Sequence, residues 1–305
     1  MKPIGIAIIG YGKIAADQHV PSIEANDRFR LLATSSRSGQ GVARSFTDWR
    51  EMISEVEGLE AVAITTPPGP RLEIAAECAK AGLHILLEKP PAATISETEQ
   101  YRVLAAQHEV TVFATWHARY NPAVFAAADL LSGKRVSSLR IIWHEDVHKW
   151  HPGQDWIWEP GGFGVFDPGI NAFSTATAIM PQPLFVKSAD LQVPENAQTP
   201  IAAEVSFGDG LSASLDWRRS EGEEWTIAVE TDDGLAVTLE KGGAELIVNG
   251  ALQPSHGMGE YPSIYTRFVD LIDNRRSDID LAPLRLVADC LLVGRTHRIE
   301  AVERT

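Results

Sequence analysis

Short apolar runs alternate with amphipathic segments over the first 117 residues. The apolar runs predict strands at residues 4–9, 29–36, 61–66, 84–89 and 111–116. The segments between them predict helices at 13–25, 47–56, 71–81 and 96–108, with Pro21 bending the first and capping-box spacing from Ser96 to Glu99 opening the last. Apolar strands separated by helices are typical of a parallel sheet that is covered on both faces.

A different pattern begins after residue 118, where polar and apolar positions alternate between glycine-rich turns. It predicts strands at residues 136–147, 186–193, 202–207, 212–217, 225–230, 235–239 and 245–248. Helices are expected at 121–133, 166–179, 261–274 and 283–295. We therefore expect two domains in an α/β protein. Residues 1–118 form the parallel-sheet domain, and residues 119–305 form an α+β domain with a large, mostly antiparallel sheet.

The composition is that of an ordinary globular protein, with 44% hydrophobic and 22% charged residues. Asp and Glu number 41 against 27 Lys and Arg, a formal net charge of −14, which argues against nucleic acid or an anionic membrane as a partner. Cys78 and Cys290 stand alone in apolar helical patterns, so no disulfide framework is expected. We find no signal-peptide pattern and no apolar run suited to a membrane span, and we expect a cytoplasmic protein.

A glycine motif follows the first predicted strand. Gly10, Gly12 and Ala15 match the pattern G-x-G-x-x-G/A, with Lys13 and Ile14 between them. In such a motif the first glycine permits a tight turn, the second lets a pyrophosphate approach the backbone, and the small third residue lets the helix pack close to the sheet. Because the motif joins a strand to a helix within a run of alternating strands and helices, we expect a Rossmann dinucleotide-binding domain.

The second predicted strand ends without the acidic residue that usually holds the ribose 2′-hydroxyl of NAD. Ser36 and Arg37 stand there instead and could bind and neutralise a 2′-phosphate. This favours NADP or use of both cofactors, although Arg37 could equally be a solvated surface arginine. Thr66 and Pro67, at the end of the third strand, are further candidates for cofactor contact.

Glu88 and Lys89 end the fourth predicted strand. Ligands of such sheets bind beyond the carboxyl ends of the strands, so Lys89 is expected near the nicotinamide. A lysine excluded from water beside a cofactor can serve in proton transfer. A surface lysine before a Pro-Pro turn is an equally good interpretation from the residues alone.

Asp167 is the only charged residue in the apolar stretch from residue 160 to 186. A lone carboxylate in such surroundings usually has a partner or a task. Asn171 lies four residues later, on the same helix face, and a carboxylate with an amide suits sugar hydroxyls. The alternative is that Asp167 only caps the helix before Pro168.

His144, Glu145 and His148 formally match the zinc motif H-E-x-x-H, but the motif requires a helix and this segment continues a strand pattern. We expect no metal site. Glu145 and Trp150 fit the lining of a pocket better. Seven of the eight tryptophans follow residue 115, and aromatic walls suit a sugar ring, although most could equally be core residues.

The glycine motif, Glu88-Lys89-Pro90 and the Asp167/Asn171 pair together resemble the glucose–fructose oxidoreductase/inositol dehydrogenase (Gfo/Idh/MocA) family over essentially the whole chain. Within that family, the bacterial D-galactose and L-arabinose 1-dehydrogenases are similar at residues 11–19, 145–154, 156–161, 164–172 and 283–289. Many family members have histidine at the position of Asn171, and an asparagine cannot act as an acid or a base.

The resemblance implies oxidation of the anomeric C1 hydroxyl of D-galactose, L-arabinose or both to the lactone, with hydride transfer to NAD or NADP. Lys89 and Asp167 would be catalytic, with Asp167 favoured as the proton acceptor. The sugar would be held by His117, Glu145, Trp150 and Asn171. The cofactor would be held by Gly10, Gly12, Lys13, Ile14, Ser36, Arg37, Thr66, Pro67, Glu88 and Lys89.

Two other functions stay open at this point. A relative could act on another polyol or on a dihydrodiol, or the scaffold could be a non-catalytic sugar or nucleotide sensor. The resemblance also implies a homo-oligomer formed through the sheet of the second domain.

Overall fold

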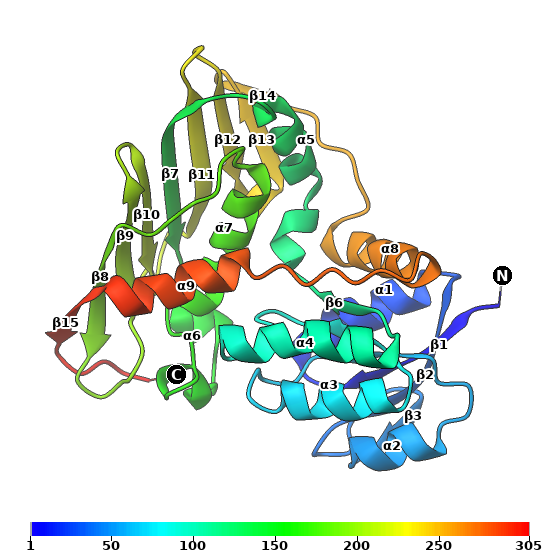
Figure 1. Ribbon diagram of the computed structural model, residues 1–305. Helices are drawn as coiled ribbons and strands as arrows, with labels where there is room; N and C mark the ends of the chain where they lie inside the picture. Colours follow the sequence, from blue (N-terminus) through cyan, green and yellow to red (C-terminus); the bar gives the residue numbers. More distant parts are fainter. Residues whose placement is uncertain (1, 305) are drawn as a thin grey trace. The chain divides into compact units, whose positions relative to one another are not determined.

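The computed structural model describes residues 2–304, which form two compact units (Figure 1). The first unit runs to His117 and also includes Met258–Leu281, and the second comprises Ala118–Gly257 and the chain from Ala282 onward. The sequence-based division assigned residues 1–118 to the first domain and 119–305 to the second. The structure instead groups Ala118 with the second unit and Met258–Leu281 with the first.

Sheet A of the first unit has six parallel strands in the order β3-β2-β1-β4-β5-β6. This is the strand order of the Rossmann fold. The strands are β1 (Ile4–Ile9), β2 (Phe29–Ser35), β3 (Arg44–Phe46), β4 (Ala61–Ile64), β5 (His84–Leu87) and β6 (Val112–Ala114). The predicted α/β class and dinucleotide-binding topology are confirmed, whereas the short edge strand β3 was missed.

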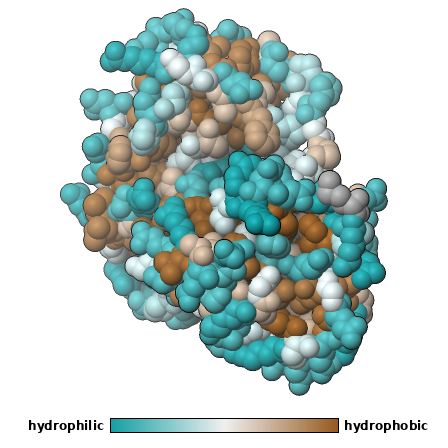
Figure 2. Space-filling model, turned by 45° about the vertical axis from the view of Figure 1, so that its right-hand side comes forward, coloured by the Kyte–Doolittle hydropathy of each residue, from teal (hydrophilic) through white to brown (hydrophobic). Residues whose placement is uncertain are grey.

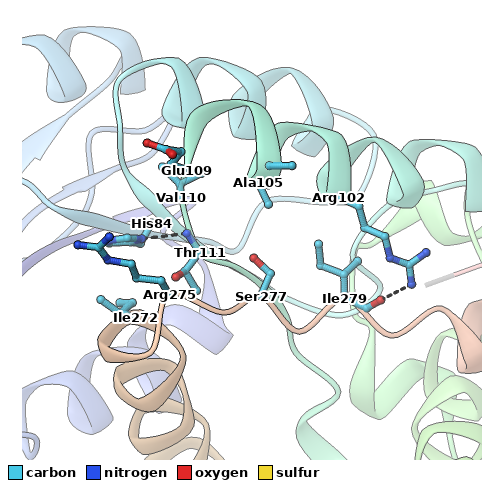
Figure 3. Close-up of a pocket in the computed structure, with 11 residues that line it drawn as sticks. His84, Arg102, Ala105, Glu109, Val110, Thr111, Ile272, Arg275, Ser277 and Ile279 are labelled. Atoms are coloured by element: carbon cyan, nitrogen blue, oxygen red, sulfur yellow. Dashed lines mark hydrogen bonds between the residues drawn. The ribbon is translucent and has the colours of Figure 1, made fainter.

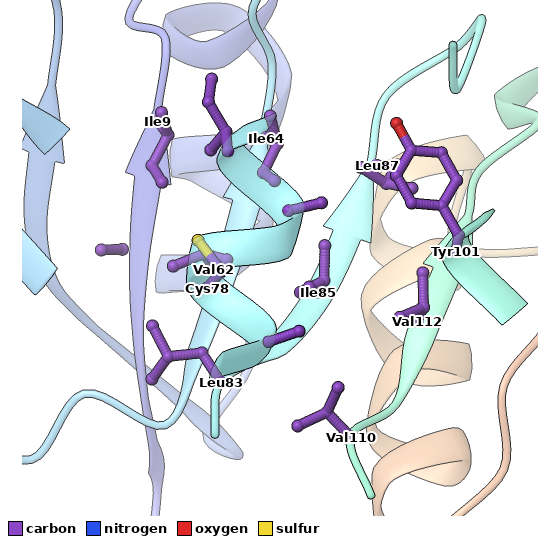
Figure 4. Packing of buried hydrophobic residues seen from close by; sticks show 14 of the residues in the cluster. Ile9, Val62, Ile64, Cys78, Leu83, Ile85, Leu87, Tyr101, Val110 and Val112 are labelled. Atoms are coloured by element: carbon purple, nitrogen blue, oxygen red, sulfur yellow. The ribbon is translucent and has the colours of Figure 1, made fainter. Parts of the chain in front are cut away.

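Helices cover both faces of sheet A. They are α1 (Val20–Glu24), α2 (Trp49–Glu55), α3 (Arg71–Lys80), α4 (Ile95–His108) and α8 (Glu260–Asp273). One core joins alternate residues of the strands to α2, α3 and α4, and Figure 4 shows Cys78 of α3 beside Val62 and Tyr101 of α4 beside Leu87 and Val112. On the other face Phe268 of α8 stacks on Phe29 and Phe113, with ring centroids 6.0 and 6.3 Å apart. The strands are apolar on both sides, so both faces of sheet A must be covered. Helix α8, from the later part of the chain, covers apolar surface that residues 1–117 leave uncovered.

Two predicted helices differ in detail from the structure. The helix after the glycine motif includes a π-helical turn, η1 (Ala15–His19), before α1, and the Val20 amide donates to the carbonyl of Ala15. Pro21 follows, at the first turn of α1, where its missing N–H is tolerated. The capping box of α4 is formed by Thr94 and Glu97, not by Ser96 and Glu99, so the helix begins at Ile95.

Sheet B of the second unit has nine strands in the order β14-β13-β12-β11-β7-β10-β9-β8-β15. The pairs β7–β10 and β8–β15 are parallel and the rest are antiparallel, as predicted for a mostly antiparallel sheet. The strands are β7 (Val136–His144), β8 (Ser188–Pro194), β9 (Ala202–Gly208), β10 (Leu211–Asp216), β11 (Glu224–Thr231), β12 (Ala236–Glu240), β13 (Glu245–Val248), β14 (Ala251–Gln253) and β15 (Arg295–Ile299).

The helices α5 (Pro122–Leu131), α7 (Phe166–Ile179) and α9 (Ala282–Val293) accompany sheet B, and α7 packs on β7 and β11. Short helical turns complete the unit: η2 (His117–Tyr120), α6 (Val147–Trp150), η3 (Asp155–Trp158) and η4 (Lys241–Gly243). Gly169 explains the close approach of α7, since a Cβ there would lie 2.6 Å from Leu215 Cδ1. The predicted bounds of α7 are confirmed.

The strand predicted at 136–147 ends earlier, at His144. Asp146 accepts a hydrogen bond from the His148 amide at 2.9 Å, which starts α6. The strands β14 and β15 were also missed. No helix among residues 2–304 is long and apolar enough to cross a membrane. Figure 2 shows hydrophilic residues spread over the face that it presents, with apolar residues in separate patches between them.

Candidate functional site

A cavity of about 710 Å³ lies at the carboxyl ends of the strands of sheet A. Its lining comprises Ile9, Gly10, Tyr11, Gly12, Ser35, Ser36, Arg37, Ser38, Thr47, Trp49, Thr65, Thr66, Pro67, Pro70 and Ile74. Six of the predicted cofactor-binding residues are therefore brought to one cavity: Gly10, Gly12, Ser36, Arg37, Thr66 and Pro67. Its position is the one where open α/β sheets bind their ligands.

The two glycines of the motif have different reasons to be glycine. Gly10 has φ +102°, and a Cβ there would lie 2.7 Å from the Thr66 amide nitrogen, so the fold itself requires glycine. At Gly12 a Cβ would meet nothing within 4 Å. The protein's own packing leaves that space open, as expected where a pyrophosphate approaches the backbone.

The loop after β4 is anchored by a buried arginine. Arg71, 3% exposed, donates through Nε to the Thr66 carbonyl at 2.8 Å and through Nη1 to the carbonyls of Glu88 and Pro90. It thus ties together the loops that follow β4 and β5. The hydroxyl of Thr66 is buried and has no hydrogen-bond partner in residues 2–304, although Thr66 lines the cavity. An orphaned hydroxyl at this position fits a polar ligand such as a dinucleotide.

The loop after β2 carries the predicted specificity residues. The Ser36 hydroxyl donates to the Gln40 carbonyl at 2.7 Å, which shapes the turn. Arg37 is exposed at the cavity, and no acidic residue lines that cavity. The residues present thus fit NADP, because a guanidinium can pair with a 2′-phosphate and no carboxylate repels it.

Lys13 and Ile14 are exposed at the start of the helix after the motif, and Lys13 pairs with Asp17. Neither residue is among those that line the cavity. Their predicted cofactor contacts stay predictions.

Lys89 is the second residue after β5, and its amide donates to Glu88 Oε2 at 2.8 Å. Glu88 is 4% exposed and also accepts from Tyr261 Oη at 2.7 Å and from His19 Nε2 at 3.1 Å. His19 is fully buried, and its Nδ1 lies 2.7 Å from Tyr265 Oη. The carboxylate of Glu88 therefore fixes the peptide of Lys89 to the π-helical turn and to α8.

The electrostatics of this cluster favour an ionised Glu88. Burial alone would raise the pKa of its carboxyl. The hydrogen bond and charge of His19, the charge of His117 and the hydrogen bond from Tyr261 all lower that pKa and together outweigh burial. The pKa of Glu88 consequently lies far below its usual range. Burial and the negative charge of Glu88 raise the pKa values of Tyr261 and Tyr265 well above 10, so both hydroxyls stay protonated.

His117, predicted to bind substrate, lies in the same unit. Its Nδ1 is 2.9 Å from Glu260 Oε2, and its ring stacks on Tyr261 with centroids 5.8 Å apart. Burial lowers the pKa of His117, yet the carboxylates of Glu260 and Glu88 raise it above its usual value and outweigh the opposing charge of Lys89. His117 is thereby favoured as a cationic hydrogen-bond donor.

In the second unit, Asp167 is the second residue of α7, whose N-cap is Val165. Asp167 is therefore not the helix cap, which was the alternative interpretation. Its carboxylate is buried, and Oδ2 lies 3.6 Å from His151 Nε2. One turn later, Asn171 Oδ1 is buried and accepts no hydrogen bond from residues 2–304. Asp167 and Asn171 therefore share one face of α7, and Asn171 Oδ1 on that face is an unused hydrogen-bond acceptor.

Glu145 follows β7 and is 5% exposed. Its carboxylate accepts hydrogen bonds from Trp225 Nε1 at 3.0 Å and from Trp217 Nε1 at 3.3 Å. The ring of His151 lies 5.1 Å from that of Trp217. Glu145 thus orients two indoles, one of which contacts His151.

Trp150, 43% exposed, packs on Trp225 with centroids 5.6 Å apart and donates to Glu223 at 2.5 Å. His144 ends β7 and lies 2.9 Å from the Ser214 hydroxyl, whereas His148 belongs to α6. No group of three or more His, Cys, Asp or Glu residues in the described part of the chain is placed to hold a metal ion.

Sequence reasoning missed His19, Tyr261, Tyr265, Glu260 and His151. His19 and Tyr261 contact Glu88, Glu260 contacts His117, and Tyr265 contacts His19. These pairs are separated by 69 to 246 residues of sequence, a separation that local patterns do not register. His151 carried a usable signal, because it directly follows Trp150, which was itself a candidate.

Comparisons with known proteins agree with this geometry. A family model described as "Oxidoreductase family, NAD-binding Rossmann fold" matches residues 4–115. The chain is 41% identical over 307 residues to galactose 1-dehydrogenase of Pseudomonas fluorescens, covering 99% of each chain. The crystal structure of D-galactose-1-dehydrogenase from Rhizobium etli is 45% identical, with a TM-score of 0.93 and 99% of both chains covered.

A more distant structure shares the fold alone. The 3-ketoreductase KijD10 of Actinomadura kijaniata, solved with NADP and TDP-benzene, is 16% identical with a TM-score of 0.82, covering 97% of this chain and 99% of its own.

Proposed function

Since the chain belongs to the oxidoreductase family with an NAD-binding Rossmann fold, we propose that it is an aldose 1-dehydrogenase acting on D-galactose. The family resemblance seen in the sequence is confirmed. The observation that carries the proposal is the full-length similarity to two galactose 1-dehydrogenases. It is supported by Lys89, two residues after the end of β5, and Asp167 at the start of α7.

The proposed reaction converts the cyclic hemiacetal to its lactone. Bound NAD or NADP supplies the acceptor for the hydride that leaves C1. The O1 proton must leave at the same time, and we assign it to the Asp167 carboxylate, with the Lys89 ammonium donating a hydrogen bond that orients O1. His151, 3.6 Å from Asp167, would hold the carboxylate in place. In the reverse assignment, neutral Lys89 would take the O1 proton and Asp167 would orient O1.

Other hydroxyls of the sugar need polar partners. Asn171 offers a buried acceptor, and His117 a donor whose positive charge Glu260 favours. Trp150 presents an exposed indole, and Glu145 fixes the neighbouring indoles. Sites of this kind discriminate epimers strongly, because a misplaced hydroxyl leaves a buried polar group unpaired.

L-Arabinose is a second proposed substrate. Its ring hydroxyls are arranged as in D-galactose, and it lacks only the hydroxymethyl group, so one set of polar contacts serves both sugars. Loss of that group removes apolar and polar contact, which we expect to appear in kcat/KM as a difference of about tenfold to a hundredfold.

We further propose that NADP is used at least as well as NAD. The support is Arg37, exposed at the cofactor cavity with no acidic residue in the lining. Arg37→Gln should lower kcat/KM for NADP about tenfold or more and leave that for NAD nearly unchanged. An unchanged NADP/NAD ratio would remove Arg37 from the phosphate contact.

A homo-oligomer formed through sheet B is also proposed. Its support is the row of half-buried residues on one side of β7 and β10, Ile142, His144, Ser214 and Asp216, opposite the buried residues that face the helices. Light scattering coupled to size exclusion tests it, and a mass equal to one chain at all concentrations would refute it.

The functional test is cofactor reduction with a panel of aldoses and polyols. We expect turnover with D-galactose and L-arabinose and little with their C4 epimers, D-glucose and D-xylose. Identification of the galactonolactone as product assigns oxidation to C1. The panel also separates the proposal from action on another polyol, and detectable turnover excludes a purely non-catalytic sensor.

A further inference from the structure

A second cavity of about 860 Å³ lies in the first unit, near the amino ends of β5 and β6 (Figure 3). Its lining comprises His84, Arg102, Ala105, Ala106, Glu109, Val110, Thr111, Ile272, Arg275, Ser277 and Ile279. His84 is the first residue of β5, whereas Lys89 follows the other end of that strand. The cavity is therefore separate from the proposed catalytic residues, although β5 and α8 contribute to both places.

The polar groups in this lining are mostly hydrogen-bond donors. His84 Nδ1 accepts from the Thr111 amide at 3.0 Å, which leaves the other ring nitrogen protonated and able to donate. Burial lowers the pKa of His84, against the charge of Glu60, so the ring is neutral at pH 7. Ser277 Oγ accepts from the Val112 amide at 3.0 Å, and its own proton is left to donate.

A buried hydroxyl strengthens the case. Thr111 is 2% exposed, and its Oγ1 has no hydrogen-bond partner in the described chain. A buried hydroxyl without a partner costs free energy, and such groups are rare in folded proteins. Thr111 lines the cavity, where a ligand acceptor could satisfy it.

Two arginines give the cavity its charge. Arg102 donates one Nη2 hydrogen bond, to the Ile279 carbonyl at 2.7 Å, and Arg275 has no side-chain hydrogen bond or ion pair within residues 2–304. The neighbouring Arg276, in contrast, pairs with Asp270 at 3.1 Å. Two guanidinium groups without a carboxylate partner are notable in a chain of net charge −14.

The backbone of Arg275 also differs from that of an ordinary residue, because its φ is positive. Arg275 follows α8 with φ +51°, in the left-handed region where glycine is favoured after a helix. An arginine at this position costs conformational energy that glycine would not, and it brings a guanidinium to the cavity.

The arrangement of these groups indicates the shape of the ligand. Figure 3 shows Arg275 and Arg102 at opposite ends of the cavity with Ser277 between them. Apolar side chains, Ala105, Val110, Ile272 and Ile279, line the space as well. Among the described residues of the lining Glu109 is the only acidic one, and Figure 3 shows it on the same side of Ala105 as His84 and Arg275, away from Arg102.

We propose that this cavity binds a small organic dianion whose two anionic groups are separated by an uncharged body, such as a dicarboxylate. One anionic group pairs with Arg275 and accepts from the donors beside it, His84 and Thr111. The other pairs with Arg102. Charge-assisted hydrogen bonds between a guanidinium and a carboxylate are about twice as strong as neutral hydrogen bonds, and bidentate pairing adds geometric specificity.

Calorimetric titration of the full chain tests the proposal. The probes are succinate, glutarate and adipate, with butyrate as a monoanion and inorganic phosphate as a compact anion. We expect at least one dicarboxylate to bind about tenfold or more tightly than butyrate and phosphate, because only it engages both arginines.

The variants R102Q and R275Q should each weaken that binding about tenfold or more, and T111V should weaken it by a smaller factor. R276Q is the matched control, since it removes the same charge one residue away and should leave binding unchanged. Melting temperatures of all four variants establish that they are folded.

Three results would overturn the proposal. One is no binding of any dicarboxylate at millimolar concentrations. Another is equal affinity for butyrate or phosphate and for every dicarboxylate. The third is an equal loss in R275Q and R276Q, which would mean that binding follows overall charge rather than this cavity.

Discussion

Replacing Glu88 with glutamine probes the buried cluster that holds the peptide of Lys89. The substitution keeps the size of the side chain and removes the charge on which His19, Tyr261 and the Lys89 amide converge. Because glutamine has one acceptor oxygen and one NH₂ group, at least one of the three donors must face another donor.

The expected cost follows from these contacts. A hydrogen bond to a charged group contributes about 1.5–3 kcal/mol and a neutral one about 0.5–1.5 kcal/mol. E88Q would lose one hydrogen bond to a charged group, weaken two others and leave one donor unsatisfied. Together these effects would lower the free energy of unfolding by several kcal/mol. The neutral amide is easier to bury than a carboxylate, which offsets part of the loss, so we expect a destabilisation of about 3 kcal/mol at pH 7.

The pH dependence gives the prediction its sign. The pKa of Glu88 is lower in the folded than in the unfolded chain, so its ionised form stabilises the fold above the unfolded pKa, about 4.3 for glutamate. That contribution is lost as the pH falls below this value toward the folded pKa. The difference between wild type and E88Q should therefore be constant from pH 8 to about pH 5.5 and shrink below about pH 4.5.

Urea denaturation of both proteins at a series of pH values measures this difference. Glu55→Gln is the control, because Glu55 pairs with Arg44 on the surface and should change stability by about 0.5 kcal/mol or less. A Glu88→Gln variant as stable as the control at pH 7 would refute the reasoning. So would a difference that stays constant down to the acid transition.

Two further perturbations test neighbouring parts of the site. Gly12→Ala should weaken cofactor binding about tenfold or more and leave the melting temperature unchanged. Gly10→Ala should lower the melting temperature, because residue 10 has a φ of +102°. If the two variants had equal effects on cofactor binding and on melting temperature, the different roles of the two glycines would be contradicted. Glu260→Gln should lower the pKa of His117, followed by NMR titration of the imidazole. Since the raised pKa stabilises the fold below about pH 6.5 and this stabilisation is lost as the pH rises through the folded pKa, Glu260→Gln should destabilise more at pH 6 than at pH 9, and an unmoved titration would exclude the pairing.

Elements with strong local signals could be predicted from the sequence. The strands of sheet A are short apolar runs, and helix Phe166–Ile179 begins and ends where the pattern indicated. The glycine motif placed the cofactor cavity because its chemistry is local: a strand, a turn and a helix in sequence. The strands β3 and β14 were missed, since each has three residues and its pairing depends on a neighbour rather than on its own pattern.

Placement across long separations could not be predicted. The amphipathic pattern of α8 indicates a helix but does not say which sheet it covers, and this helix packs on sheet A through Phe268. For the same reason the sequence could not show that Tyr261 and Glu260 of α8 contact Glu88 and His117. The predicted cofactor contact of Glu88 stays a prediction, and its hydrogen bonds with the Lys89 amide and Tyr261 add a role as an anchor for the peptide of Lys89.

The most direct test of the central claim is steady-state reduction of NADP and NAD by D-galactose, with wild type and the variants Lys89→Ala and Asp167→Asn. We predict galactonolactone as the product and a loss in kcat of about a hundredfold or more in each variant, with little change in cofactor affinity. Wild-type protein that fails to oxidise D-galactose or L-arabinose with either cofactor would contradict the claim, as would a Lys89→Ala variant with undiminished kcat.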